Sequence, residues 1–402
     1  MKQGHEFYKE IDSLCWLSKN LYNYANYLIR QSFIFEEKYL NYNEIQKRVQ
    51  SNESYKALPA KVSQQILMVL DRNWKSFFEA RQTWKQNPSL FLGRPKLPKY
   101  KHKQKGKNLL IYTIKAISQK GLARGILKLS KTDITIKTKV KNIKQVRIIP
   151  KLDHYVIEVV YEHESTNNQL DVSRIASIDI GLNNLAAITF NQAGMQPLLI
   201  NGRPLKSINQ FFNKQKAQFQ SRLKNQKQTT HRIQKLCTKR NFKIDDYLHK
   251  ASRFIVDYLV ANDIGTLVIG KNPNWKQEIN LGKQTNQSFT QIGQARFVEM
   301  ISYKAELAAI TVKLQEESYT SKSDFFKLDL IPVYQPNTEI KPTFSGRRIS
   351  RGLYKSGTEK IFSSDINGSY NIMRKAIPNA FAEGVEGLVV VPVRVTPSKL
   401  AA

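Results

Sequence analysis

Apolar side chains recur at helical spacing over the first 85 residues of the chain. Leu14, Leu17 and Leu21 follow one another at intervals of three and four residues, and Ile66 and Leu70 begin a second stripe of the same kind. Such stripes are typical of amphipathic helices that bury one face. We therefore expect a helical region in which the aromatic residues of these stripes, Tyr24, Trp74 and Phe77, lie in a core and do not stack on bases.

The spacing of apolar residues changes from helical to alternating between residues 109 and 164. Five short runs rich in Ile, Val and Tyr are separated by Gly, Asp and Asn: LLIYTI, ILKLS, DITIKT, QVRIIP and HYVIEVVYE. Alternation between such breaks is typical of short strands. We expect a small antiparallel sheet or β-barrel with its lysines facing outward, followed by a linker at 165–168.

Beyond residue 174, apolar strand candidates alternate with helical patterns. Strands are expected at 175–182, 185–190, 197–200, 266–270 and 311–317, the third of them at an edge of the sheet, and helices at 203–243, 246–260 and 294–310. Alternation of this kind indicates an α/β domain. The whole chain is therefore expected to be a multidomain α+β protein with an α/β second half. The apolar tail LVVVPVRV also looks strand-like, but the sequence assigns it no function.

The chain carries far more positive than negative charge. Lys and Arg number 64 against 32 Asp and Glu, which gives a formal net charge of +32. A compact protein with this charge repels itself unless a polyanion neutralises it, and the clustering of the cations is typical of nucleic-acid-binding proteins. We expect nucleic acid as a partner; a merely very soluble protein is the alternative.

Three segments concentrate these cations. RPKLPKYKHKQKGK, at 94–107, has no acid, and its prolines prevent a regular helix, so we expect an extended strip along a phosphate backbone or else a solvated linker. The segment 203–243 has twelve Lys or Arg and no acid, which indicates a helix beside nucleic acid or a coiled-coil contact. FSGRRISRGLYKSG, at 344–357, is either a nucleic-acid-binding segment or an unstructured cationic loop. The residues expected to contact nucleic acid are Arg94, Lys96, Lys99, Tyr100, Lys101, Lys206, Lys214, Arg222, Lys250, Arg347, Arg348, Arg351 and Lys355.

Cysteine usage and hydropathy narrow the class of protein further. Cys15 and Cys237 stand far apart, so the sequence has neither a disulfide framework nor paired zinc-ligand motifs. No run approaches the ~20 apolar residues that span a bilayer. We expect no membrane partner and a cytoplasmic or DNA-associated location.

Asp179 is the acidic residue of an otherwise apolar strand candidate, between Ile178 and Ile180. Burial of a lone carboxylate costs several kcal/mol, so a cationic partner is expected. Hydrolysis of a phosphodiester by divalent metals needs several carboxylates at one point, because two Mg²⁺ ions must lie about 3.5 to 4 Å apart. From the residues alone, Asp179 is equally well a metal ligand or a structural acid that caps a loop or pairs with a lysine.

Six segments share their order and spacing with a known family. They are SIDIGLNNLAAIT, NGRPLKSINQFF, YLHKASRFIVDYL, YKAELAAITVKLQEESYTSK, FSGRRISRGLY and SDINGSYNIMRK. Together they resemble the TnpB (OrfB) proteins of insertion-sequence transposons, relatives of the type V CRISPR effector nucleases, over residues 94 to 378. The resemblance implies an RNA-guided DNA endonuclease whose partners are a guide RNA and target double-stranded DNA.

The same resemblance implies three carboxylate ligands for a two-metal Mg²⁺ site. Asp179 matches the first aspartate of the RuvC nuclease domain, and Asp365 matches the last. The middle glutamate usually follows the second strand of the site, where this chain has Gly270, but a subgroup that resembles this chain has it in the ESYTSK stretch, here Glu317. Neighbouring strand ends lie about 5 Å apart, so Glu317 could reach the same metal. We favour Glu317 over Glu316 because side chains alternate across a strand.

The resemblance also implies a domain order and an absence of zinc. Family members commonly have two cysteine pairs between the second and third acidic motifs, and this chain has no cysteine beyond position 237. The expected order begins with a helical recognition region (1–93) and a basic linker and β-barrel wedge domain (94–173). The first part of an RNase H-like RuvC domain follows (174–319), with a basic helical insertion (203–260). A basic target-nucleic-acid-binding insertion (320–364) then precedes the last part of RuvC and a C-terminal tail (365–402). We expect one chain or a dimer per guide RNA, in the nucleoid-associated cytoplasm of a prokaryote or in the nucleus of a eukaryote.

Two other functions stay open. A catalytically inactive relative would use a guide RNA to occupy DNA as a repressor, although the three retained carboxylates argue against it. A guide-independent RNase H-like nuclease would purify without a discrete RNA.

Overall fold

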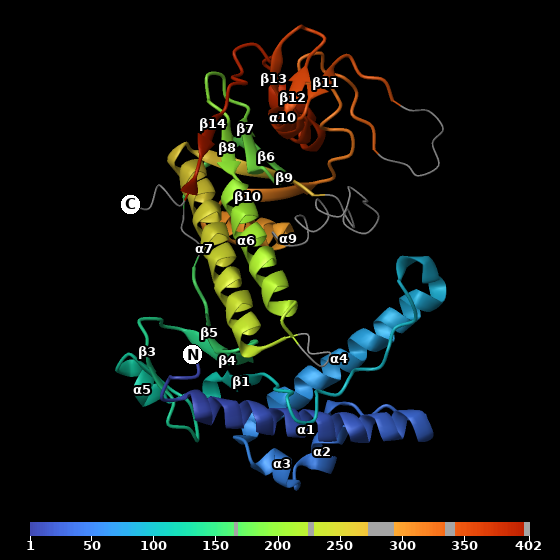
Figure 1. Cartoon of the computed structure of the whole chain (residues 1–402), viewed down its shortest axis with the longest axis vertical. Helices are drawn as coiled ribbons and strands as arrows, with labels where there is room; N and C mark the ends of the chain where they lie inside the picture. The colour runs from blue at the N-terminus through green and yellow to red at the C-terminus, as the bar shows by residue number, and fades with distance from the viewer. Residues whose placement is uncertain (165–167, 224–228, 272–292, 334–341, 398–402) are drawn as a thin grey trace. The chain divides into compact units, whose positions relative to one another are not determined.

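The computed structural model describes residues 1–164, 168–223, 229–271, 293–333 and 342–397. The linker expected at 165–168 therefore lies almost entirely outside the described residues. The chain divides into two compact units, Met1–His163 and Glu164–Ala402 (Figure 1). Both units combine helices and strands, which confirms the multidomain α+β class.

The first unit begins with helices. They are α1 (Tyr8–Phe35), α2 (Tyr42–Val49), α3 (Glu53–Lys56) and α4 (Ala60–Gln86), followed by the short η1 (Pro88–Leu90). The two predicted stripes lie on α1 and α4, where Leu21, Ile66 and Trp74 are buried in one core. The stripes therefore form a core, as their spacing predicted.

The strands of the first unit form a small antiparallel sheet and a hairpin. The sheet has the order β1 (Leu110–Thr113), β4 (Ile143–Pro150), β5 (Tyr155–Tyr161), and the hairpin pairs β2 (Ile126–Lys128) with β3 (Thr135–Lys137). The connecting helices are η2 (Ile114–Ala116) and α5 (Gln119–Ala123). Each of the five predicted runs overlaps a strand, and the β-barrel wedge domain stays a prediction.

A six-stranded sheet organises the second unit. Its order is β10 (Thr311–Gln315), β9 (Ile264–Gly270), β6 (Asp171–Ile180), β7 (Asn184–Phe190), β8 (Leu198–Asn201), β14 (Val393–Val395). Strands β6, β9 and β10 are mutually parallel, and β7 runs antiparallel to both β6 and β8. The strand at 197–200 is not the edge strand we expected, because β14 of the C-terminal tail pairs with it in parallel.

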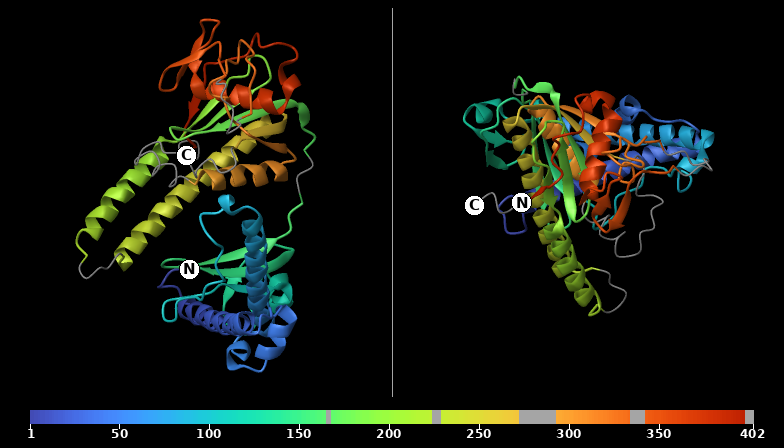
Figure 2. Two further views of the ribbon diagram at one scale, coloured as in Figure 1. Left: turned by 90° about the vertical axis from the view of Figure 1, so that its right-hand side faces the viewer. Right: turned by 90° about the horizontal axis from the view of Figure 1, so that it is seen from above.

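Helices cover both faces of this sheet, as the left view of Figure 2 shows. Helices α7 (His231–Ala261) and α9 (Gln294–Leu307) share a core with Ile178 and Leu267 on one face. Helix α10 (Ser364–Ala376), followed by η3 (Pro378–Phe381), packs against Val268 on the other face through Ile372. Helix α6 (Arg203–Gln220) packs along α7.

The expectation of one helix over 203–243, followed by a second at 246–260, is wrong. Helix α6 ends at Gln220, and α7 starts at His231 and continues to Ala261. Thr230 starts α7, because its side chain accepts a hydrogen bond from the backbone N–H of Ile233. The connection between the two helices includes residues 224–228, which lie outside the described residues.

The 320–364 segment contains strands that its sequence pattern did not reveal. Strands β11 (Arg347–Ser350), β12 (Leu353–Lys355) and β13 (Ile361–Ser363) form an antiparallel sheet. Tyr354 and Phe362 from these strands are buried in a core with Tyr370 of α10. The basic segment 344–357 is therefore not an unstructured loop.

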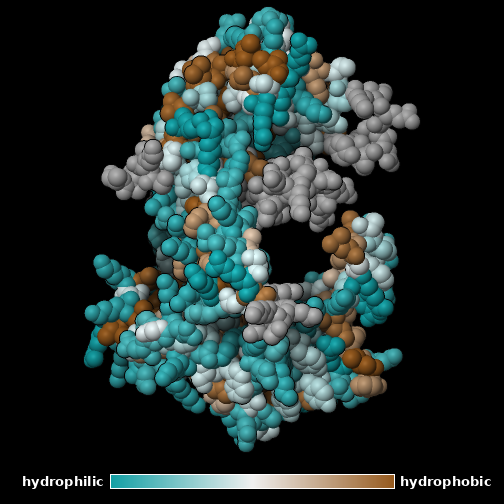
Figure 3. All heavy atoms as spheres, viewed as in Figure 1, coloured by the Kyte–Doolittle hydropathy of each residue, from teal (hydrophilic) through white to brown (hydrophobic). Residues whose placement is uncertain are grey.

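Hydrophilic side chains cover most of the face shown in Figure 3. Across the described ranges, none of the helices combines the length and the apolar character that a membrane crossing requires.

Candidate nuclease site

Asp179 lies near the carboxyl end of β6. The register pairs Ile178 with Ile269 of β9, so continuing it by one residue places Asp179 beside Gly270. Gly270 in turn pairs with Gln315 of β10. The carboxyl ends of three parallel strands therefore meet at one edge, which is where open α/β sheets bind ligands.

Glu317 reaches over the end of β9 from the neighbouring strand. Strand β10 ends at Gln315, so Glu317 lies in the following loop and not within the strand as expected. A Cβ atom added to Gly270 would lie 2.6 Å from the Oε2 atom of Glu317. The Glu317 carboxylate thus occupies the space that a side chain at Gly270 would need, and a glycine there is compatible with it.

Asp365 lies in the first turn of α10, and the next turn of this helix touches Asp179. A Cβ atom added to Gly368 would lie 2.7 Å from the Oδ2 atom of Asp179, so any larger residue there would push the Asp179 carboxylate from its position. Asn184, at the start of β7, donates a hydrogen bond of 2.8 Å to the Oδ2 atom of Asp365. The positive end of the helix dipole also favours a carboxylate at this position.

The three carboxylates are partly exposed and influence one another electrically. Desolvation, and then the negative charges of Glu317 and Asp365, raise the pKa of Asp179 well above its usual range, while Arg348 acts in the opposite direction. Burial, and then the charge of Glu316, raises the pKa of Glu317 to about 7. A divalent cation would relieve this accumulation of negative charge.

The neighbouring Glu316 has a different environment. Its carboxylate forms an ion pair of 2.6 Å with Lys375 and accepts a hydrogen bond from the backbone N–H of Ser318. Burial works against ionisation of Glu316, but the hydrogen bonds from Lys375 and Ser318 hold its pKa below the usual value. Glu316 therefore fastens the loop to α10.

The donor set at the sheet edge suits a hard cation. Within the described ranges, no three His, Cys, Asp or Glu side chains converge closely enough to hold a metal ion as they stand. Asp179, Glu317 and Asp365 supply carboxylate oxygens, the ligands that Mg²⁺ prefers. Rotation of these partly exposed side chains would be needed to bring them round a shared ion.

Two asparagines of α10 were missed by the sequence reasoning. The side chain of Asn367 donates to the backbone oxygen of Ser323 at 2.7 Å, and Asn371 donates to the backbone oxygens of Thr320 at 2.9 Å and Ser323 at 2.7 Å. These bonds tie the loop after β10 to α10. The sequence signal is a pair of asparagines four residues apart, an unusual choice for a helix interior.

Two aspartates hold the 320–363 segment together. Asp324 is buried and accepts hydrogen bonds from the Ser356 hydroxyl at 2.8 Å and from the Gly357 N–H at 2.6 Å. Asp329 accepts from the N–H and the hydroxyl of Ser345 at 2.9 and 2.6 Å. These contacts lie in the segment where the resembling family commonly has cysteine pairs.

The basic strip at 94–107 is fixed to α1 through its backbone. Asn23 donates to the carbonyl of Lys101 at 2.9 Å and accepts from its N–H at 2.8 Å, and Asn26 donates to the carbonyl of Pro98 at 3.0 Å. The segment is thus an extended, docked strip and not a solvated linker. The members expected to contact nucleic acid are all exposed: Arg94, Lys96, Lys99, Tyr100 and Lys101.

The other cations expected to contact nucleic acid lie on the second unit. Lys214, Arg222, Arg347, Arg348 and Arg351 are exposed. Lys206 donates to the side chain of Asn183 at 2.8 Å, Lys250 pairs with Asp246 at 3.1 Å, and Lys355 pairs with Glu359.

Comparison with known proteins places this geometry in context. The OrfB family model, described as a probable transposase, matches residues 158–276. A TnpB-like protein of Methanocaldococcus jannaschii is 23% identical over 241 residues, which cover 58% of this chain and 79% of that protein. The structure of a Cas12f1 complex with sgRNA and target DNA covers 90% of this chain and 82% of the Cas12f1 chain, with a TM-score of 0.52 and 15% identity, and so shows a similar fold. These findings confirm the resemblance drawn from the motifs: the chain is similar to TnpB (OrfB) proteins and shares its fold with Cas12f1.

Proposed function

We propose that this protein is an RNA-guided DNA endonuclease of an insertion-sequence transposon, which hydrolyses target double-stranded DNA with Mg²⁺. The observation that carries the proposal is the position of Glu317. Its carboxylate lies over Gly270, beside Asp179, where the resembling family usually has its middle glutamate. The match to the OrfB family model and the fold shared with Cas12f1 support the same activity.

Each site residue has a defined part in this proposal. Asp179, Glu317 and Asp365 would hold the two metal ions, and Asn184 orients the Asp365 carboxylate through its hydrogen bond. Bound Mg²⁺ supplies Lewis-acid chemistry: it activates water and stabilises the charge that develops on the phosphate. The strand order of the six-stranded sheet, with β7 antiparallel, supports the RNase H-like RuvC assignment of this unit.

The partners follow from charge and from the relative of known structure. Cas12f1 was solved with sgRNA and target DNA. We propose the same two classes of partner here, because a net charge of +32 needs a polyanion and exposed cations occur on both units. Base pairing with the guide RNA would select the target strand, while the protein would bind the phosphate backbone of the RNA–DNA duplex, as Cas9 does.

The test begins with the RNA that accompanies the purified chain. A discrete, protected RNA should copurify, and the complex should cut DNA that matches the RNA when Mg²⁺ is present. Guided binding without cleavage would identify a repressor, and cleavage without any bound RNA would identify a guide-independent nuclease. Either result would overturn the proposal.

A further inference from the structure

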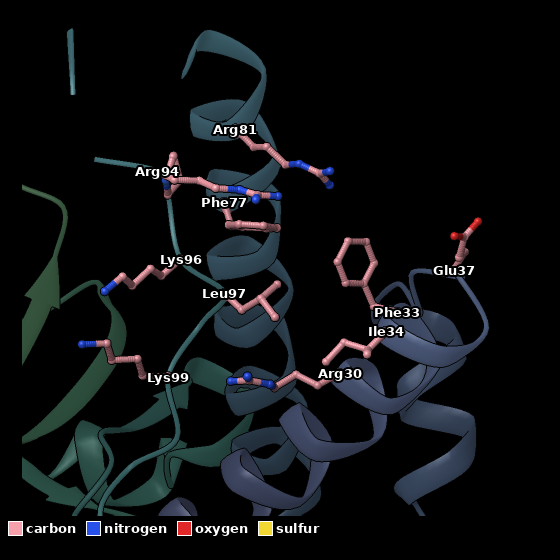
Figure 4. Close-up of a pocket in the computed structure, with 11 residues that line it drawn as sticks. Arg30, Phe33, Ile34, Glu37, Phe77, Arg81, Arg94, Lys96, Leu97 and Lys99 are labelled. Carbon is pink, nitrogen blue, oxygen red and sulfur yellow. The ribbon is translucent and has the colours of Figure 1, made fainter. Parts of the chain in front are cut away.

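A groove of about 820 Å³ lies in the first unit among α1, α4 and residues 94–99 (Figure 4). Its lining is partly apolar and includes Phe33 and Ile34 of α1, Phe77 of α4 and Leu97. Ile34 is 49% exposed and Phe33 is half-buried, so apolar surface remains open to solvent. A groove of this size, with open apolar surface and a few convergent polar groups, is typical of a binding site.

Two guanidinium groups reach across this apolar lining. Figure 4 shows Arg81 of α4 and Arg94 extending above Phe77 toward α1, whereas Lys96 and Lys99 point away. In the described parts of the chain, no ion pair involves Arg81 or Arg94. Their charges are therefore available to an anionic ligand.

A third arginine keeps the groove in shape. Arg30 donates to the carbonyl of Pro98 at 3.2 Å, and its guanidinium lies 4.9 Å from the centre of the Tyr100 ring. With Asn26, which bonds the same carbonyl, Arg30 fixes the strip as one wall of the groove. The site is thus formed before any ligand arrives, which lowers the entropy cost of binding.

We propose that this groove binds a short unpaired stretch of nucleic acid, with a base against Phe33 and neighbouring phosphates on Arg81 and Arg94. An aromatic side chain beside cations is the arrangement that holds single strands, because an unpaired base offers its face for stacking whereas a base within a duplex does not. Charge complementarity selects the occupant, since Glu37 is the one acid of the lining against five Lys or Arg. The inference rests on the proposed function in one respect: that function identifies the polymer that supplies the unpaired stretch as guide RNA or target DNA.

The first test measures binding of labelled single-stranded octamers of RNA and of DNA to the full-length chain over a range of salt. The double variant Arg81→Gln with Arg94→Gln should bind the RNA octamer, the DNA octamer or both roughly tenfold more weakly. The slope of log affinity against log salt concentration should become shallower by about 1.4, since two phosphate contacts are lost. The matched control carries Arg72→Gln and Arg124→Gln, which remove two exposed arginines of the same unit outside the groove. An equal loss in the control would overturn the proposal, because it would mean that only net charge matters.

The second test locates the base. An octamer with 5-iodouridine should crosslink to Phe33 on irradiation. The Phe33 ring packs edge-on against Trp74, Phe77 and Phe78, so Phe33→Leu, which keeps apolar volume, is checked for an unchanged circular dichroism spectrum; it should weaken octamer binding roughly fivefold. Crosslinks found only outside the groove would contradict the proposal. So would an arginine variant that still binds the octamer more tightly than a duplex of matching sequence. The RNA and DNA arms identify the source of the stretch.

Failure of this inference and failure of the proposed function are distinguishable. If the groove variants bind octamers like the wild type while guided cleavage is intact, the groove inference falls alone. If no guided cleavage occurs but octamer binding still depends on Arg81 and Arg94, the nuclease proposal falls and the groove stands.

Discussion

Replacement of Glu317 by glutamine should stabilise the metal-free protein at pH 8, whereas the same change at Glu316 should destabilise it. The pKa of Glu317 is raised from 4.5 to about 7, so its protonated form is favoured in the folded state. The contribution of Glu317 to stability is therefore present below about pH 4.5 and is lost as pH rises through about 7. At pH 8 the wild type bears this cost, and the neutral glutamine avoids it.

The size of the effect follows from the shift. About 2.5 pKa units correspond to at most about 3.4 kcal/mol at 1.36 kcal/mol per unit. Partial exposure of Glu317 reduces this, so roughly 1 to 2 kcal/mol is expected. For a unit of this size, each kcal/mol changes the melting temperature by about 2 to 4 °C. At pH 5 the folded wild type is mostly protonated at Glu317, and the two proteins should differ little.

Glu316→Gln is the matched control because it is the adjacent residue with a pKa shifted in the other direction. Its ion pair with the nearly buried Lys375 would be lost, which should cost roughly 1 to 3 kcal/mol at pH 8. Thermal unfolding in EDTA, with the transition of the second unit assigned by hydrogen exchange, measures both variants. A Glu317→Gln protein that melts below the wild type at pH 8 would refute the reasoning about this site.

Three further predictions follow from named contacts. Asn184→Ala should slow guided cleavage roughly tenfold without weakening guide RNA binding, because Asp365 loses its hydrogen bond; single-turnover kinetics and a binding assay separate the two. Asp324→Asn should lower the melting temperature of the second unit by several degrees, since Ser356 loses a charged acceptor, while zinc chelators should not change it. Asn23→Ala should make the strip at 94–107 more sensitive to trypsin, as time courses against the wild type would show; unchanged cleavage would contradict the docking described above.

Long apolar elements of the second unit could be predicted from the sequence because their patterns are repeated and strong. Strands β6, β7 and β9 were each expected near their observed positions. The short strands β11 to β13 were not, because three or four residues are too few for alternation to stand out. Their stability comes from Tyr354 and Phe362 packing against α10, which is a tertiary effect.

The candidate site was accessible to sequence reasoning only in part. Neither composition nor spacing decided between a structural acid and a metal ligand at Asp179; the family resemblance supplied that preference. The approach of Glu317 to Gly270 depends on the parallel pairing of β9 with β10 and on the path of the loop after Gln315. These are contacts between distant segments, which local pattern does not encode.

Guided cleavage by Asp179→Ala tests the central claim most directly. With purified protein, its guide RNA, matched DNA and Mg²⁺, the variant should bind RNA and DNA nearly as the wild type does and should leave the DNA uncut. Cleavage at the wild-type rate would contradict the assignment of the carboxylates at the end of β6 as the nuclease site.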